Sequence, residues 1–181
     1  MIYVFLAEGF EEIEALTPID CLRRAGKQVI TVGVGGKIIA GAHGIQVVAD
    51  ITDLELELND ALEMVVLPGG MPGTRNLGNS DIVRRAILYA NDSGKWVTAI
   101  CAAPTILGKM NLLSGKQAVC YPGCEGELAG AKIGTEAVCV DGKIVTGKGP
   151  GAALEFGLML VECLLGTDTR NTLAANMVCK R

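Results

Sequence analysis

Histidine, positive charge and long apolar runs are all scarce in this sequence. Its 181 residues include a single histidine, His43, which excludes any site that needs several histidines. The formal net charge of −4 argues against a nucleic-acid partner, because general binding to the phosphate backbone requires a basic surface. No apolar run is long enough to span a membrane, and the N-terminus enters a strand without the segments of a signal peptide. We therefore expect no membrane partner.

The cysteines also lack the spacing of a metal site. The seven cysteines stand at positions 21, 101, 120, 124, 139, 163 and 179. No C-x-x-C pair suitable for zinc is among them, and the odd number does not match a short secreted disulfide framework. The glycines of residues 33–36 are not followed by a phosphate-binding helix and are interpreted as a turn. We expect no metal, no cofactor and a reducing, cytoplasmic location.

What the sequence does contain is an alternation of apolar strands and helical patterns. Strands are expected at residues 1–6, 28–34, 63–68, 95–100 and 117–121, and helices at 11–26, 80–91, 104–110, 152–165 and 169–175. Residues 37–48 and 137–146 are expected to form hairpins, and residues 73–78 a loop. Strands that alternate with helices predict an α/β sandwich with a mostly parallel central sheet. The length suits one domain, residues 1–181.

Cys101 stands where the strand at residues 95–100 gives way to a helix. In open parallel sheets, ligands bind at this edge. A helix N-terminus also favours the thiolate, which is the nucleophilic form of cysteine. The small residues Ala102 and Ala103 suit a sharp turn that leaves the sulfur uncrowded. Cys101 is therefore a candidate reactive cysteine with an exposed thiol of low pKa, and the alternative is a small residue buried in the core.

Glu14 belongs to a line of residues along the first expected helix. Glu14, Pro18, Cys21 and Ala25 follow one another at spacings of four, three and four, and only Glu14 among them is charged. This line is expected to face inward, whereas the first-turn acids Glu11 and Glu12 are expected to be solvated. Burial raises the pKa of a carboxylic acid, so that it can donate a proton near neutral pH. The alternative is that Glu14 is an exposed acid, as most acids are.

Four motifs, in this order, resemble those of the DJ-1/ThiJ/PfpI family and its ThiJ branch in particular. They are residues 6–14 (LAEGFEEIE), 66–70 (VLPGG), 99–104 (AICAAP) and 149–151 (GPG). The resemblance spans nearly the whole chain. It implies a flavodoxin-like three-layer sandwich that forms a homodimer.

The resemblance also implies roles for particular residues. Cys101 would be the reactive cysteine, and Glu14 the acid hydrogen-bonded to it. The backbone N–H groups of Gly70 and Ala102 would form an anion-binding pocket beside the sulfur. The glycines after the strand at residues 63–68 are consistent with this, because glycine allows backbone N–H groups to point into a site.

The sequence departs from the family pattern at two positions. Tyr121 replaces the histidine that many members carry after the corresponding strand, and a tyrosine with its ordinary pKa of about 10 is a poor base. Ala102 replaces the histidine that follows the cysteine in the peptidase-like branch, which disfavours a cysteine–histidine protease. Tyr121 remains a candidate for substrate positioning. His43 is a second such candidate, because its turn lies near the dimer interface in relatives, although a histidine in a turn is more often a plain surface residue.

The function that the resemblance implies is a cysteine-dependent, cofactor-independent enzyme acting on small reactive carbonyls. Methylglyoxal or glyoxal would be converted into a hydroxy acid, as in glyoxalase III, and glycated adducts would be related substrates of a deglycase. The alternative is a redox-sensing or chaperone-like stress protein in which Cys101 oxidises to a sulfinate.

Overall fold

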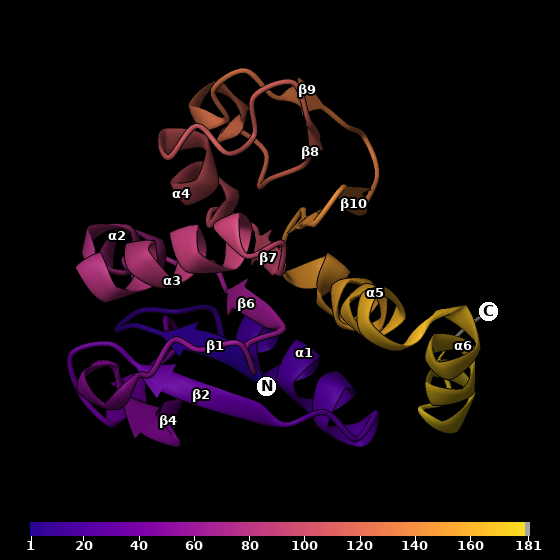
Figure 1. Cartoon of the computed structure of the whole chain (residues 1–181), viewed down its shortest axis with the longest axis horizontal. Coiled ribbons are helices and arrows are strands. Elements are labelled where there is room, and N and C mark those ends of the chain that lie inside the picture. Colours follow the sequence, from indigo (N-terminus) through magenta and orange to yellow (C-terminus); the bar gives the residue numbers. More distant parts are fainter. Residues whose placement is uncertain (180–181) are drawn as a thin grey trace.

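A seven-stranded sheet forms the centre of the computed structural model, which describes residues 1–179 (Figure 1). Its strands are β1 (Ile2–Leu6), β2 (Val29–Gly33), β5 (Ile51–Thr52), β6 (Met64–Leu67), β7 (Trp96–Ile100), β10 (Val138–Asp141) and β11 (Ile144–Gly147). They lie in the order β10-β11-β7-β6-β1-β2-β5. Every neighbouring pair is parallel except the β10–β11 hairpin. The carboxyl ends of β1, β6 and β7 therefore meet at one edge of the sheet.

Helices cover both faces of this sheet and complete a three-layer sandwich. The helices are α1 (Glu12–Arg24), α2 (Gly73–Asn79), α3 (Asp81–Asp92), α4 (Pro104–Lys109), α5 (Ala153–Leu165) and α6 (Thr167–Asn176). The core on one face joins the sheet to α1, α5 and α6. The core on the other face joins it to α2, α3 and α4. This arrangement confirms the α/β sandwich with a mostly parallel sheet.

Strand β1 shows why the central strands are apolar throughout. Ile2, Val4 and Leu6 pack into the core with α1, whereas Tyr3 and Phe5 pack into the core with α3. Side chains of a strand alternate between faces, so a strand covered on both faces must be apolar at every position. All five side chains are buried.

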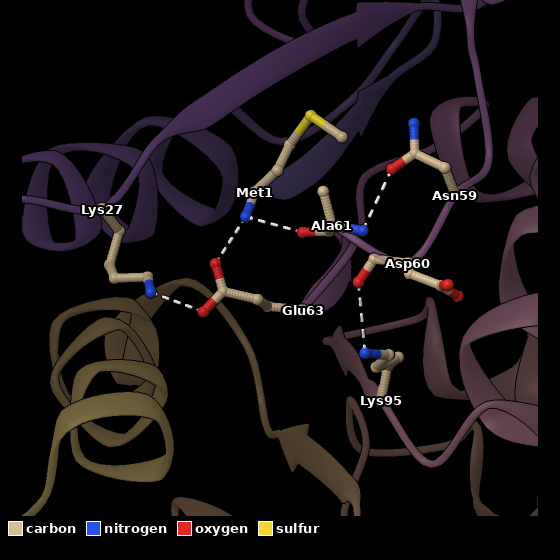
Figure 2. A network of polar contacts seen from close by, with 7 residues as sticks. All are labelled: Met1, Lys27, Asn59, Asp60, Ala61, Glu63 and Lys95. Carbon is tan, nitrogen blue, oxygen red and sulfur yellow. Dashed lines mark hydrogen bonds and ion pairs between the residues drawn. The ribbon is translucent and has the colours of Figure 1, made fainter.

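A polar network fixes the N-terminus beside β6 (Figure 2). The Met1 ammonium donates to the carbonyl oxygen of Ala61 at 2.9 Å and also to the Glu63 carboxylate. Lys27 Nζ donates to the other oxygen of Glu63 at 2.5 Å. The network ties the start of β1 to the start of β6, its neighbour in the sheet, in the register that pairs Ile2 with Met64.

Short elements lie outside the central sheet. They are the hairpin of β3 (Ile38–Ala40) and β4 (Gln46–Val48), the pair of β8 (Gln117–Ala118) and β9 (Lys132–Ile133), and the 3₁₀ turns η1 (Asp53–Glu55), η2 (Glu125–Glu127) and η3 (Pro150–Ala152). The β8–β9 pair lies beside β10, at the top of Figure 1. None of the helices in residues 1–179 has the length and apolar character needed to cross a membrane.

Two expected elements differ from the structure. The predicted loop at residues 73–78 is the helix α2, whose Leu77 is buried in the core among α3 and α4. The predicted strand at residues 117–121 ends after two residues as β8. Beyond β8 the backbone leaves the strand ladder, because the N–H of Val119 donates to Thr146 Oγ1 and the N–H of Tyr121 donates to the carbonyl of Cys101.

Candidate active site

Cys101 occupies a strained turn directly after β7. Its φ angle is 67°, in the left-handed region that residues other than glycine rarely adopt. The turn is held on both sides, since the Cys101 N–H donates to the carbonyl of Gly147 and the Cys101 carbonyl accepts from Tyr121, both at 2.8 Å. Such a conformation costs about 1–3 kcal/mol and tends to occur at functional sites. The sharp turn expected from Ala102 and Ala103 is confirmed.

Glu14 reaches the same place from α1. Its side chain is completely buried, and the line of Glu14, Pro18 and Cys21 faces inward as expected. Glu14 Oε2 accepts a hydrogen bond of 2.9 Å from the N–H of Gly69, which follows β6. Oε1 has no hydrogen-bond partner within residues 1–179 and is the oxygen on which a proton can reside.

Gly69 lets Glu14 and Cys101 approach each other. A Cβ atom at position 69 would lie 2.6 Å from Glu14 Oε2 and 2.7 Å from Cys101 Cβ. Both distances are too short for any side chain, so only glycine fits between the acid and the cysteine. The sequence pattern drew attention to Gly70 but gave no role to Gly69, whose N–H is the donor to Glu14.

Burial and mutual proximity raise the pKa values of both groups. Burial raises the pKa of Glu14 to about 7, although hydrogen bonds with Cys101 and with the Gly69 N–H oppose the shift. Burial raises the pKa of Cys101 to about 12, and the Glu14 charge and its hydrogen bond to the thiol add to the effect. The expected exposed thiol of low pKa is therefore wrong, since Cys101 is only 8% exposed. Between these pKa values the pair holds one proton.

Two backbone N–H groups next to the Cys101 sulfur oppose the rise of its pKa. The N–H groups of Ala102 and Gly70 hydrogen-bond the thiolate form of Cys101 and lower its pKa. Gly70 has a φ angle of 88°, and a Cβ there would lie 2.4 Å from the Glu11 nitrogen, so glycine is required. The structure thus places Gly70, Ala102 and Glu14 around Cys101. Negative charge that develops next to the sulfur would face these two N–H donors.

Tyr121 reaches Cys101 through its backbone. Its N–H bonds the Cys101 carbonyl, but within residues 1–179 its hydroxyl has no hydrogen bond to Cys101 or Glu14. The ring lies against Gly149, where an added Cβ would be 3.3 Å from Tyr121 Cδ2. The side chain is 49% exposed and borders a hollow of about 330 Å³ that includes Pro150. Substrate positioning by Tyr121 remains a prediction.

His43 lies on the surface, where its ring contacts acids at the start of α1 and does not contact the Cys101 site. Its Nδ1 is 2.9 Å from Glu12 Oε2 and 3.6 Å from Glu11 Oε2. The hydrogen bond with Glu12 and the nearby negative charges raise the pKa of His43. The expectation that Glu12 is solvated is wrong, because the side chain is buried and its Oε1 accepts from the N–H groups of His43 and Ile45.

Glu11, Glu12 and His43 have ligand atoms close enough together to surround a cation. Both oxygens of Glu12 already accept hydrogen bonds from the β3–β4 turn. The group is fully accounted for as a hydrogen-bonded connection between α1 and that turn, and we assign no metal to it.

The fold and the site together define a class of protein. Its members are parallel α/β sandwiches in which one cysteine, held in a left-handed turn, lies beside a buried acid. Comparison with known proteins narrows the class. The model of the DJ-1/PfpI family matches residues 1–163, and the chain belongs to this family.

Individual relatives match over almost their whole length. The protein named dj-1beta of Drosophila melanogaster is 35% identical over 97% of this chain and 95% of its own length. The glutathione-independent glyoxalase DJR-1.2 of Caenorhabditis elegans is 30% identical over 92% of this chain and 89% of its own. The solved structure of oxidized Toxoplasma gondii DJ-1 superposes with a TM-score of 0.94 at 35% identity, covering 99% of this chain and 98% of that one.

Proposed function

We propose that this protein is a cysteine-dependent enzyme, working without a bound cofactor, that converts methylglyoxal or glyoxal into the corresponding hydroxy acid. Deglycation of the adducts of these carbonyls is a related activity of the same site. The observation that carries the proposal is the geometry of the site, in which the buried Glu14 carboxyl and Cys101 meet at Gly69 and burial raises the pKa of both groups. The relative that is named a glutathione-independent glyoxalase supports the same reaction type.

The first step forms a bond between the Cys101 sulfur and the aldehyde carbon. The Glu14 carboxylate takes the proton of the Cys101 thiol, and the resulting thiolate attacks the carbonyl carbon. The carbonyl oxygen becomes an oxyanion that accepts hydrogen bonds from the N–H groups of Gly70 and Ala102. Glu14 then gives its proton to this oxygen, and the product is a hemithioacetal.

The second step moves a hydrogen within the bound substrate. The Glu14 carboxylate removes the proton from the former aldehyde carbon and returns it to the neighbouring carbonyl carbon. The first carbon is thereby oxidised to a thioester, and the second is reduced to an alcohol, with no external oxidant or reductant. Water then cleaves the thioester, which releases the hydroxy acid and restores the Cys101 thiol.

Turnover without glutathione tests this proposal. Purified protein is incubated with methylglyoxal in the presence of a metal chelator, and lactate is measured for the parent, Cys101→Ser and Cys139→Ser. Cys139 is also buried but lies on the distant edge strand β10, so it serves as the matched control. We expect activity in the parent and in Cys139→Ser and none in Cys101→Ser. A parent rate no higher than that of Cys101→Ser would exclude the enzyme.

A redox-sensing or chaperone-like role is the second candidate, in which Cys101 oxidises to a sulfinate. It is favoured by the likeness to a solved DJ-1 structure described as oxidized. The N–H groups of Gly70 and Ala102 that face the sulfur would also bond sulfinate oxygens. Mild peroxide followed by peptide mapping should then modify Cys101 before the other cysteines. Earlier oxidation of Cys124 or Cys179, which are less buried, would argue against this role.

The proposal includes a homodimer in a reducing, cytoplasmic compartment. All seven cysteines are free thiols in the structure, which suits such a compartment. Ile13 and Leu16 of α1 are 52% and 38% exposed, and exposed apolar side chains on one helix favour contact with a second copy. Sedimentation equilibrium should give twice the mass of the chain.

A further inference from the structure

A second pocket lies between α2, α3 and α4, apart from Cys101. It has a volume of about 480 Å³, within the range of small-molecule sites. Its residues include Arg75 from α2, Arg84 from α3 and Lys109 from α4, whereas Cys101, Glu14 and Tyr121 do not line it. Three cations from three helices thus converge on one hollow of a chain whose net charge is −4.

The two arginines of this pocket are free to bind an anion. Within residues 1–179, the arginine ion pairs belong to Arg23, Arg24 and Arg170, and neither Arg75 nor Arg84 takes part in one. A guanidinium group presents a planar fork of N–H donors that matches the oxygens of a phosphate. Among residues 1–179, the only carboxylate lining the pocket is that of Glu127, which lies 2.8 Å from Lys109 Nζ and already neutralises that cation.

Other residues of the pocket suit the body of a small organic phosphate. Ile106 and Met110 line it with apolar side chains, and Asn79 adds an amide. Thr74 also lines it, and its buried hydroxyl has no hydrogen-bond partner within residues 1–179. A polar ligand in the pocket can supply the hydrogen-bond partner that this hydroxyl lacks.

We infer that this pocket binds a small phosphate monoester, with Arg75 and Arg84 holding the phosphate group. This pocket is separate from the Cys101 site, and its phosphate binding does not depend on the proposed carbonyl chemistry. It is nevertheless joined to the Cys101 site through the backbone. The Thr74 N–H donates to the Gly70 carbonyl at 2.8 Å, and Thr105 Oγ1, at the same pocket, donates to the Ala102 carbonyl at 2.7 Å.

The experiment measures binding of glycerol 3-phosphate by calorimetry, with glycerol and malonate as comparison ligands. Arg84→Gln is matched by Arg85→Gln, because Arg85 is the next residue of α3, is also exposed and does not line the pocket. The two variants remove the same charge. We expect Arg84→Gln and Arg75→Gln to weaken binding about tenfold or more, as for hydrogen bonds to charged groups, and Arg85→Gln to leave it unchanged.

Glu127→Gln tests the site in the opposite direction. Removing this carboxylate frees Lys109 for the phosphate, and we expect binding to tighten about two- to fivefold, the value of an exposed ion pair. Amide signals of Thr74 and Ile106 should shift on titration, which locates the ligand. Glycerol should not bind, and malonate should bind more weakly than the phosphate. Equal weakening in Arg84→Gln and Arg85→Gln, tighter binding of malonate, or no binding by the parent would overturn the inference.

Discussion

Because Glu14 is buried, the free energy of unfolding of this protein should depend on pH. Replacing Glu14 by glutamine should remove this dependence. The pKa of Glu14 is raised from its ordinary value of 4.5 to about 7 because the native state buries it. A raised pKa means that the native state binds the proton more tightly than the unfolded state. The stabilisation of the native state by the protonated Glu14 is therefore complete below about pH 4.5 and is lost as the pH rises through about 7. A shift of this size corresponds to about 3 kcal/mol.

The perturbation is Glu14→Gln, which keeps the size of the side chain and an oxygen to accept from the Gly69 N–H. Urea unfolding at several pH values between 4.5 and 8 gives the free energy of unfolding of each variant. We expect the parent to lose about 3 kcal/mol relative to Glu14→Gln over this range. Glu155→Gln, at an exposed position of α5, is the control and should show no such change. A constant difference between the parent and Glu14→Gln would refute the buried, proton-sharing Glu14.

Two further predictions concern the residues whose roles the sequence left open. Tyr121→Phe should lower the glyoxalase rate by about tenfold or less, which corresponds to about 1.4 kcal/mol of activation barrier. The loss should be this small because Glu14 carries the proton transfer and Tyr121 only positions the substrate. A loss as large as that of Cys101→Ser in the lactate assay would assign the proton transfer to Tyr121. The ring of His43, the single histidine, should titrate by NMR above its ordinary pKa of 6.5. Its contact with Glu12 should then stabilise the fold below about pH 6.5 and lose this effect as the pH rises through the raised pKa. Glu12→Gln should bring the pKa down more than Glu11→Gln, because Glu12 is the nearer partner, and equal effects would contradict the hydrogen bond.

The fold could be predicted from the sequence because its strands and helices have strong local signals. The run Met64–Leu67 is apolar at every position, as a strand covered on both faces must be. Helix α2 was missed because its sequence, GTRNLGN, contains two glycines and a single apolar residue, Leu77. Its position depends on contacts distant in sequence, such as the burial of Leu77 against α3 and α4, which no local pattern reveals.

The burial of Glu14 was predictable from the sequence, but the electrostatics around Cys101 were not. The helical spacing of Glu14, Pro18 and Cys21 correctly indicated a buried acid. A helix N-terminus suggested a low pKa for Cys101, but burial and the charge of Glu14 outweigh it. The burial of Cys101 and the charge of Glu14 beside it both arise because α1, the turn after β6 and the turn after β7 meet in space. The buried Glu12 was missed for a similar reason, since its partners lie in the β3–β4 turn about thirty residues away.

The pH dependence of kcat/KM for methylglyoxal tests the central claim most directly, namely that Glu14 and Cys101 share the proton that drives the reaction. Only the pair with one proton can supply both a thiolate and an acid. We therefore predict that kcat/KM rises with pH to about 7, where the first proton leaves the pair, and then stays level through the weakly alkaline range. Cys101→Ser should show no activity at any pH. A flat profile through pH 7, or turnover by Cys101→Ser, would contradict the account.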